Sequence, residues 1–280
     1  MPRHLLLAAL LLVPWLHAQS KNPPAPKTPR LFVFDCGSLE IPDTSPYQLK
    51  KEELATSRMS VACFLIAHPR GAMIWDAGAV PESAFKNDGK PAMIRYATAQ
   101  KPFRAQLAEV GYSPSDIQYL ALSHFHWDHI GNANLFAGAT WLVRKPDHDV
   151  MFSDPPSPRT QPENYSALKN AKTVYITTED YDVFGDGTAV IKSAPGHSPG
   201  HQVLYLKLAK TGQVVLSGDL YHYPEERKLN KIPTTEFNAP QTVASRASLE
   251  AFLKKTGAQL WIQHDYTANG KLKKAPQFYE

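Results

Sequence analysis

The stretch SHFHWDHIGN, from Ser123 to Asn132, concentrates side chains that bind metal ions. It holds three of the eleven histidines of the chain, together with one aspartate. His124 and His126 are separated by one phenylalanine, so both imidazoles can face the same side of an extended or turning chain. Asp128 and His129 follow at the expected turn into a helix, where they can reach a neighbouring point. This spacing predicts ligands for two metal ions rather than one, and a surface loop with incidental histidines explains it poorly.

Three more residues with metal-binding side chains lie elsewhere in the chain. His197 is in the Gly/Pro-framed turn APGHSPGH, Asp219 ends the apolar run VVLSGD, and His264 follows the run LWIQ. Each residue alone would more often be structural. Together with the first stretch they supply five histidines and two carboxylates, about what two ions need with a position left for water. A carboxylate at the position of Asp219 could bridge both ions.

The elements that must position these residues are predicted from apolar runs and turn residues. Strands are expected at 30–39, 59–68, 72–78, 119–124, 140–145, 173–184, 188–195, 202–210, 213–219 and 258–265, and helices within 101–117, 130–136 and 242–256. Two strand-rich halves, each ending in a helix and with no linker between them, predict one α/β domain of two sheets flanked by helices. The candidate ligands follow strand ends, where α/β folds place reactive groups.

Two segments interrupt this pattern. Val80–Gln100 contains Pro, Gly and charged residues and is predicted to be a long loop or lid. The Pro-rich stretch SDPPSPRTQPENY, 153–165, is predicted to be a second loop. A loop of that length is more than a connection, so it is a candidate for shaping a binding cleft.

The N-terminus has the pattern of a secretory signal peptide. Arg3 precedes the apolar run LLLAALLLVPWL, which is too short to span a membrane, and HAQS follows it. We expect a signal peptide at 1–20, cleaved after Ala18 or Ser20, then a linker at 21–30 and a metallo-hydrolase domain at 31–280. An uncleaved anchor is the alternative. The mature protein is expected to be exported, periplasmic or secreted, without a membrane span.

Composition narrows the class of protein. Of the 280 residues, 43% are hydrophobic, which is enough for a sizeable globular core. The formal charge of +4 is small, and no dense Lys/Arg block suggests a nucleic-acid partner. Cys36 and Cys63 both lie in apolar strand-like runs. An exported protein could pair them, but two buried thiols are as good a reading because strand register cannot be derived from sequence.

The order His-x-His-x-Asp-His, a Gly-His turn, Gly-Asp and a late His resembles the metallo-β-lactamase superfamily. The resemblance covers nearly the whole chain after the signal peptide. It implies an αββα sandwich, two sheets packed face to face with helices outside. It also implies that Asp219 bridges two metal ions, one held by His124, His126 and His197 and the other by Asp128, His129 and His264.

Within that superfamily the chain is most similar to the N-acyl homoserine lactonases. This resemblance rests on SHFHWDHIGN, APGHSPGHQV, SGDLYHYPEE, WIQHD and the early DCGSL. It implies a small-molecule substrate, a lactone ring opened with two divalent ions. Zinc is expected, although His/carboxylate sites also accept Mn, Fe or Co. Two such ions can lower the pKa of a shared water towards neutrality, and Asp128 could pass a proton to the departing alkoxide.

The residues around the ligands extend this hypothesis. Phe125, Trp127 and the Val80–Gln100 segment could form an apolar wall for an acyl chain, although Phe125 is as well explained by core packing. Lactonases of this type often carry a tyrosine three residues after the bridging aspartate. Here that residue is His222. Tyr221 or His222 is therefore the candidate for contacting the substrate carbonyl or leaving group.

Other functions stay open. Organophosphate or aryl ester hydrolases share the scaffold. True zinc β-lactamases generally lack a bridging aspartate where Asp219 stands, and glyoxalase II thioesterases carry a basic C-terminal helical region not seen after His264. An exported metal-binding protein without activity would more naturally have lost a ligand. The oligomeric state is open, and a homodimer is compatible with the sequence.

Overall fold

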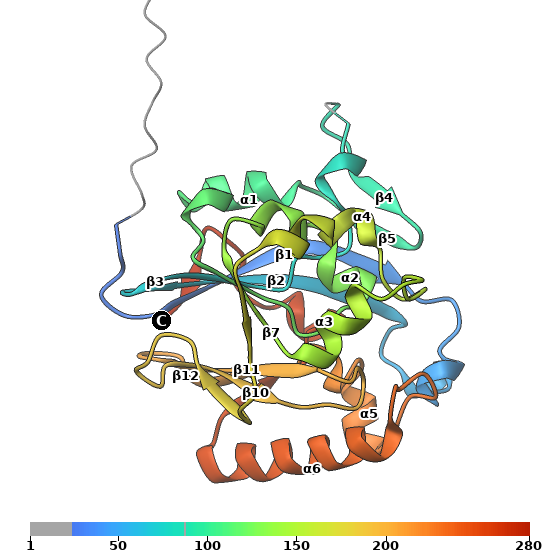
Figure 1. Ribbon diagram of the computed structural model, residues 1–280. Helices are drawn as coiled ribbons and strands as arrows, with labels where there is room; N and C mark the ends of the chain where they lie inside the picture. The colour runs from blue at the N-terminus through green and yellow to red at the C-terminus, as the bar shows by residue number, and fades with distance from the viewer. Residues whose placement is uncertain (1–23, 87) are drawn as a thin grey trace, which may run out of the picture.

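Residues 24–86 and 88–280 form two β-sheets packed face to face, with helices on both outer faces, in this computed structural model (Figure 1). The αββα sandwich predicted from the sequence is confirmed. The predicted signal peptide and residues 21–23 of the predicted linker lie outside the described residues. Among the described helices, none combines the length and the apolar character that a membrane span requires.

The larger sheet has nine strands among the described residues, in the order β4-β5-β1-β2-β3-β6-β7-β8, with β14 pairing on β1. Neighbours from β3 to β8 are parallel, so their carboxyl ends lie at the same edge of the sheet. The strands are β1 (Arg30–Glu40), β2 (Arg58–His68), β3 (Gly71–Trp75), β4 (Ala92–Ile94), β5 (Ala97–Ala99), β6 (Tyr119–Ala121), β7 (Thr140–Val143), β8 (Thr173–Tyr175) and β14 (Phe278–Tyr279).

The smaller sheet has five strands in the described part of the chain, in the order β13-β12-β11-β10-β9. Its strands are antiparallel except for the parallel pair β12 and β13. They are β9 (Asp180–Asp182), β10 (Ala189–Ser193), β11 (Gln202–Leu208), β12 (Gly212–Leu216) and β13 (Gln259–Trp261).

Alternating side chains build the layers. Leu31 and Val33 of β1 join the core between the two sheets, whereas Phe32 and Phe34 join the core under the outer helices. Successive side chains of a strand face opposite sides, so one strand contributes to both layers. β2 is apolar or small along almost its whole length because both of its faces are covered.

Helices close the two outer faces (Figure 1). The larger sheet is covered by α1 (Phe103–Glu109), α2 (Trp127–Ile130) and α4 (Pro162–Tyr165), while α3 (Lys145–Met151) lies lower, near β7 and β11. The long α6 (Ala239–Thr256) runs along the smaller sheet, with Leu249 and Leu253 packed on Val203 and Val215. The side chain of Asn238 caps its first turn, and Gly257 ends it in a left-handed conformation. The short helices α5 (Pro224–Leu229) and α7 (Tyr266–Asn269) complete the fold.

A disulfide joins Cys36 of β1 to Cys63 of β2. The register pairs Phe34 with Cys63, and an irregularity between Asp35 and Ser38 shifts the strands next to the bond. The sequence left disulfide and buried thiols as equal alternatives, and the disulfide is the one that the structure contains.

Several predicted elements are wrong in detail. The segment 80–100, predicted as a loop, contains the β4–β5 hairpin, which pairs with β1. The run 173–184, predicted as one strand, is divided between the two sheets as β8 and β9. The predicted helix at 130–136 is instead the end of α2 followed by a tighter turn at Ala133–Phe136. The predictions contained no α3, α4, α5, α7 or β14.

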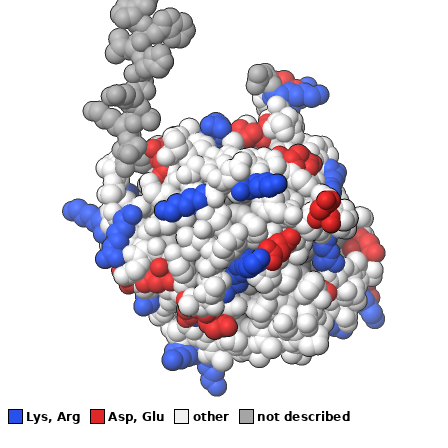
Figure 2. All heavy atoms as spheres, viewed as in Figure 1, with Lys and Arg blue, Asp and Glu red and all other residues white. Residues whose placement is uncertain are grey.

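Basic and acidic side chains are interspersed on the face shown in Figure 2. This mixture agrees with the small formal charge of +4. On this face, neither sign of charge forms a separate patch.

Candidate metal centre

The candidate ligands meet where strands of both sheets end. His124 follows β6 of the larger sheet, while His197 and Asp219 follow β10 and β12 of the smaller one. His264 follows β13. The sandwich therefore holds side chains from four strand ends against one another, which no single loop could do.

His124, His126, His197 and Asp219 form the first group, in which one donor atom of each residue lies within 4.8 Å of the others. His197 Nε2 lies 2.9 Å from His126 Nδ1 and 3.4 Å from Asp219 Oδ2. His124 Nε2 lies 3.6 Å from the same carboxylate oxygen. Four donor atoms thus surround one point.

Asp128, His129 and His264 form the second group. His129 Nε2 and His264 Nε2 each lie 3.1 Å from Asp219 Oδ1, and 3.3 Å from each other. His264 Nε2 is also 3.5 Å from Asp128 Oδ2. One oxygen of Asp219 therefore faces the first group and the other faces the second, which is the arrangement of a bridging carboxylate.

Buried acceptors hold the ring orientation of three of the histidines. His197 Nδ1 lies 3.1 Å from Glu236 Oε1, and His264 Nδ1 lies 2.7 Å from the backbone carbonyl oxygen of Ser60. An imidazole that donates through Nδ1 keeps its Nε2 lone pair for a metal. His129 is held in the same way by Asp76, through an Nδ1 to Oδ2 distance of 2.9 Å.

Asp76 is a supporting residue that the sequence analysis missed. It is fully buried and has a left-handed backbone, with φ +59°. Besides His129, it accepts hydrogen bonds from the Ser123 amide at 2.6 Å, the Ser123 hydroxyl at 2.9 Å and Gln263 Nε2 at 2.6 Å. Asp76 directly follows β3, but the predicted strand 72–78 placed it inside a strand, so the pattern of polar residues at strand ends did not identify it.

A glycine allows Asp219 to reach both groups. Gly218 has φ +49°, and a Cβ there would lie 2.7 Å from His201 Nε2 and 2.7 Å from Ser123 Cβ. His201 Nε2 accepts a hydrogen bond from the Asp219 amide at 3.0 Å. The close approach of backbone and imidazole thus fixes the bridging carboxylate.

Burial sets the protonation of the imidazoles. It lowers the pKa of His124, His126 and His197 well below the usual value, so these rings are neutral and can donate a lone pair. At His129 burial acts in the same direction, but the carboxylates around it, Asp219 foremost, outweigh burial and raise the pKa well above the usual value.

The residues present fit two metal ions. His124 Nε2 is buried and makes no hydrogen bond within the described residues. A buried polar atom without a partner costs about 1–3 kcal/mol, so such atoms call for a ligand. Imidazole and carboxylate donors of this kind suit zinc, manganese, iron or cobalt.

A pocket of about 270 Å³ opens over both groups. The β4–β5 hairpin contributes Arg95 and Tyr96, and the Pro-rich segment contributes Pro158 and Arg159. Both irregular segments singled out in the sequence therefore line the cleft. Its apolar residues are Leu39, Ile41, Met59 and Trp127. Phe125 is instead buried in the core under the outer helices.

The two candidates for contacting the substrate lie in different places. His222 lines the pocket, with Nε2 3.4 Å from Asp219 Oδ2 and Nδ1 3.2 Å from Glu226 Oε1. Tyr221 does not line it, because its hydroxyl donates to Glu250 Oε1 at 3.1 Å and its ring packs under Arg246. The structure therefore corrects the expectation for Tyr221, since adjacent residues point to opposite sides of the chain.

Tyr47 brings a phenol to the pocket from a distant part of the sequence. Its ring packs edge-on against His222, with centroids 4.9 Å apart, and it lines the pocket. The Thr234 amide donates to the Pro46 carbonyl oxygen at 2.7 Å and ties the turn Ser45–Tyr47 to the far side of the cleft. The Tyr47 hydroxyl makes no hydrogen bond within the described residues. No motif in the sequence marks this residue.

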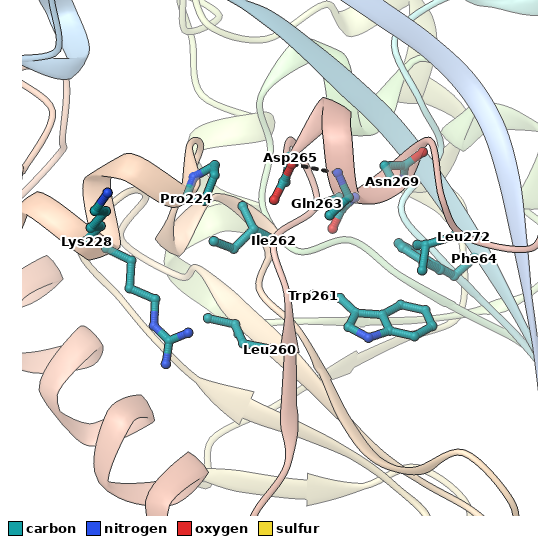
Figure 3. Close-up of a pocket in the computed structure, with 12 residues that line it drawn as sticks. Phe64, Pro224, Lys228, Leu260, Trp261, Ile262, Gln263, Asp265, Asn269 and Leu272 are labelled. Carbon is teal, nitrogen blue, oxygen red and sulfur yellow. Dashed lines mark hydrogen bonds between the residues drawn. The ribbon is translucent and has the colours of Figure 1, made fainter. Parts of the chain in front are cut away.

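A larger cavity lies elsewhere. It has a volume of about 670 Å³ and is bounded by α5, the β13 segment and α7, with Trp261 and Leu260 among its walls (Figure 3). Gln263 is its one lining residue that also contacts the metal centre, through Asp76. None of the candidate ligands lines this cavity, so the smaller pocket is the one that serves the centre.

Comparisons with known proteins agree with this geometry. The sequence profile of the metallo-beta-lactamase superfamily matches residues 56–263. The chain belongs to the metallo-β-lactamase superfamily. Its ligand-bearing strand ends, from His124 to Asp219, lie within the matched range.

Individual superfamily members are similar over most of their length. The N-acyl homoserine lactonase AttM of Azorhizobium caulinodans is 29% identical over 274 residues, 90% of this chain and 98% of that protein. AttM of Agrobacterium fabrum is 28% identical, over 89% and 98%. A solved structure of a Bacillus thuringiensis AiiA mutant, with N-decanoyl-L-homoserine at its active site, superposes with a TM-score of 0.73 at 24% identity, covering 89% of this chain and 98% of that one.

Proposed function

We propose that this protein is a hydrolase with two divalent metal ions that opens the lactone ring of N-acyl homoserine lactones. The observation that carries the proposal is the position of Asp219, whose two carboxylate oxygens face two separate groups of ligands. All seven predicted ligands belong to these groups. The names of the two similar AttM proteins support the choice of substrate.

The residues of this chain have separable roles in that reaction. Two bound ions supply an activated water and polarise the lactone carbonyl. Asp128, at the floor of the pocket, is placed to hold the proton of the attacking water and return it to the leaving alkoxide. His222 contacts Asp219 and lies between the ligands and the open pocket.

We assign to Tyr47 the role of contacting the substrate carbonyl or leaving group, for which the sequence had suggested Tyr221 or His222. Its free hydroxyl lines the pocket beside His222, where it can donate a hydrogen bond to an oxygen that gains negative charge. The walls Leu39, Ile41, Met59 and Trp127 exclude water and suit an acyl chain.

Zinc is the ion that we propose for both positions. Histidine-rich sites with one or two carboxylates are typical of zinc hydrolases, although Mn, Fe or Co also bind such donors. Metal analysis of protein expressed in medium with equal amounts of the four metals identifies the preferred ion. Manganese, iron or cobalt in excess over zinc would contradict this choice.

We propose that the mature protein is exported, with 1–20 removed as a signal peptide. The apolar run after Arg3 and the Cys36–Cys63 disulfide both support an oxidising destination. N-terminal sequencing of protein from the periplasm or medium of a secreting bacterium should begin after Ala18 or Ser20. A homodimer stays a prediction, and light scattering of the mature protein tests it.

A hydrolysis panel tests the function. Metal-loaded protein is offered an N-acyl homoserine lactone, a simple lactone, a β-lactam, a glutathione thioester and a phosphotriester. We expect the highest kcat/KM for the acyl homoserine lactone. A higher value for any other substrate class would reject the proposal in favour of that class. Two bound metals without hydrolysis of any of them would indicate a metal-binding protein.

A further inference from the structure

Two arginines lie at the mouth of the pocket, and their side chains contact different residues. Arg95 and Arg159 both line it and both are exposed. Within residues 24–86 and 88–280 neither forms a salt bridge with a carboxylate. The Arg95 guanidinium packs over the Trp127 ring, 5.1 Å from its centroid. With the side-chain amide of Gln161 turned so that its oxygen faces Arg95, that oxygen accepts hydrogen bonds from Arg95 Nε and Nη2 at 3.1 Å. Arg95 thus has partners of its own.

Arg159 faces a metal ligand. Its Nη1 lies 3.4 Å from Nε2 of His126. The other ring nitrogen of His126, Nδ1, lies 2.9 Å from His197 Nε2 and so faces the first ligand group. A guanidinium nitrogen can only donate, so this contact is a hydrogen bond only while Nε2 of His126 carries no proton.

When His126 binds a metal ion through Nδ1, its Nε2 carries a proton and can no longer accept from Arg159. A neutral imidazole that gives its Nδ1 lone pair to a cation carries its proton on Nε2. Nε2–H of His126 and the N–H groups of Arg159 then both donate, and they cannot bond to each other. An oxygen placed between them would accept from both. Both residues line the pocket, so a carbonyl or carboxylate oxygen of a bound molecule could reach both donors.

We propose that Arg159 and the Nε2–H of His126 together bind the amide carbonyl oxygen of the substrate's acyl group. This inference rests on the proposed function and adds a determinant of specificity to it. Acyl homoserine lactones carry the amide, whereas alkyl lactones do not. An alkyl lactone has no acceptor for these donors and gains nothing from the exposed Arg159, so Arg159 selects acylated lactones by adding affinity for the amide alone.

The test compares two lactones and two arginines. Arg159→Met removes the donors but keeps an unbranched side chain, and Arg95→Met removes an equal charge from the same mouth. Zinc-loaded wild type and variants, checked for equal metal content, are assayed with N-hexanoyl homoserine lactone and γ-decalactone. Arg159→Met should lower kcat/KM for the amide substrate by about tenfold or more and leave γ-decalactone within about twofold. Arg95→Met should leave the ratio of the two unchanged.

Product affinity gives a readout independent of turnover. Calorimetry measures binding of the ring-opened products, N-hexanoyl-homoserine and 4-hydroxydecanoate, to the zinc-loaded proteins. Arg159→Met should weaken only the first. The inference would be overturned if Arg159→Met lost equal affinity for both products. It would also be overturned if both arginine variants lost equal affinity for N-hexanoyl-homoserine. Failure of the wild type to hydrolyse either lactone would reject the proposed function, whereas hydrolysis with an unchanged ratio in Arg159→Met would reject this inference alone.

Discussion

Some residues of the site could be predicted from the sequence, and others became apparent only in the structure. All seven candidate ligands were identifiable because imidazole and carboxylate side chains follow strand ends in a recognisable order, and the structure gathers them into two groups. Asp76 and Tyr47 were not, because their roles depend on contacts made across the fold: Asp76 reaches His129, and Tyr47 reaches His222. Tyr221 and His222 are neighbours in sequence, and only the path of the chain after Asp219 decides which one enters the pocket.

Asp219 is the residue whose loss should affect both metal positions. Asp219→Ala removes a charge that faces both groups, so we expect loss of both ions and a fall in kcat of about 100-fold or more. His126→Ala should affect one position more than the other, and Asp149→Ala, at an exposed carboxylate, should affect neither. Metal analysis alongside steady-state kinetics measures the difference. Retention of both ions in Asp219→Ala would show that it is not the bridge.

Tyr47 is tested by removing only its hydroxyl. Tyr47→Phe keeps the ring that packs on His222, so metal content should not change. Loss of a donor to a developing oxyanion should lower kcat by about tenfold to 100-fold with a smaller effect on KM. Tyr221→Phe is the matched control and should stay within about threefold of the wild type, because its hydroxyl serves Glu250. Equal kinetics of the two variants would remove Tyr47 from the mechanism.

Helices and strands with long apolar runs were predicted from the sequence. Short strands that depend on pairing with a distant part of the chain were missed. β1, β2 and α6 follow from pattern alone, and the structure contains them. The β4–β5 hairpin was missed because each strand is only three residues long, and because β5 is stabilised by pairing with the distant β1. The division of 173–184 between two sheets depends on tertiary packing, which no local pattern encodes.

The turn after β12 is the element on which the bridging carboxylate depends. Gly218→Ala would place a Cβ 2.7 Å from His201, so we expect a loss of stability of about 1–3 kcal/mol and a lower metal content. Gly212→Ala is the control, because its φ is also positive, at +85°, but nothing lies within 4 Å of the added Cβ. Thermal denaturation and metal analysis compare the two. Equal effects would mean that backbone strain alone, and not the contact with His201, explains the cost.

At the scale of the whole molecule, the disulfide joins two long strands of the larger sheet. Cys36→Ser combined with Cys63→Ser should lower the free energy of unfolding by about 2–4 kcal/mol, because the bond restricts the unfolded chain. Urea denaturation of metal-free protein measures this without a contribution from bound ions. A metal-free double variant as stable as the wild type would show that the bond is dispensable for folding.

The two sheets together place two groups of candidate metal ligands around the carboxylate of Asp219. The most direct test of this account is a metal titration of the metal-free protein, in which hydrolysis of N-hexanoyl homoserine lactone is followed as zinc is added. We expect activity to rise until two ions are bound per chain, one for each ligand group, and then to stay constant. Full activity with one ion per chain, or activity that persists after complete chelation, would contradict it.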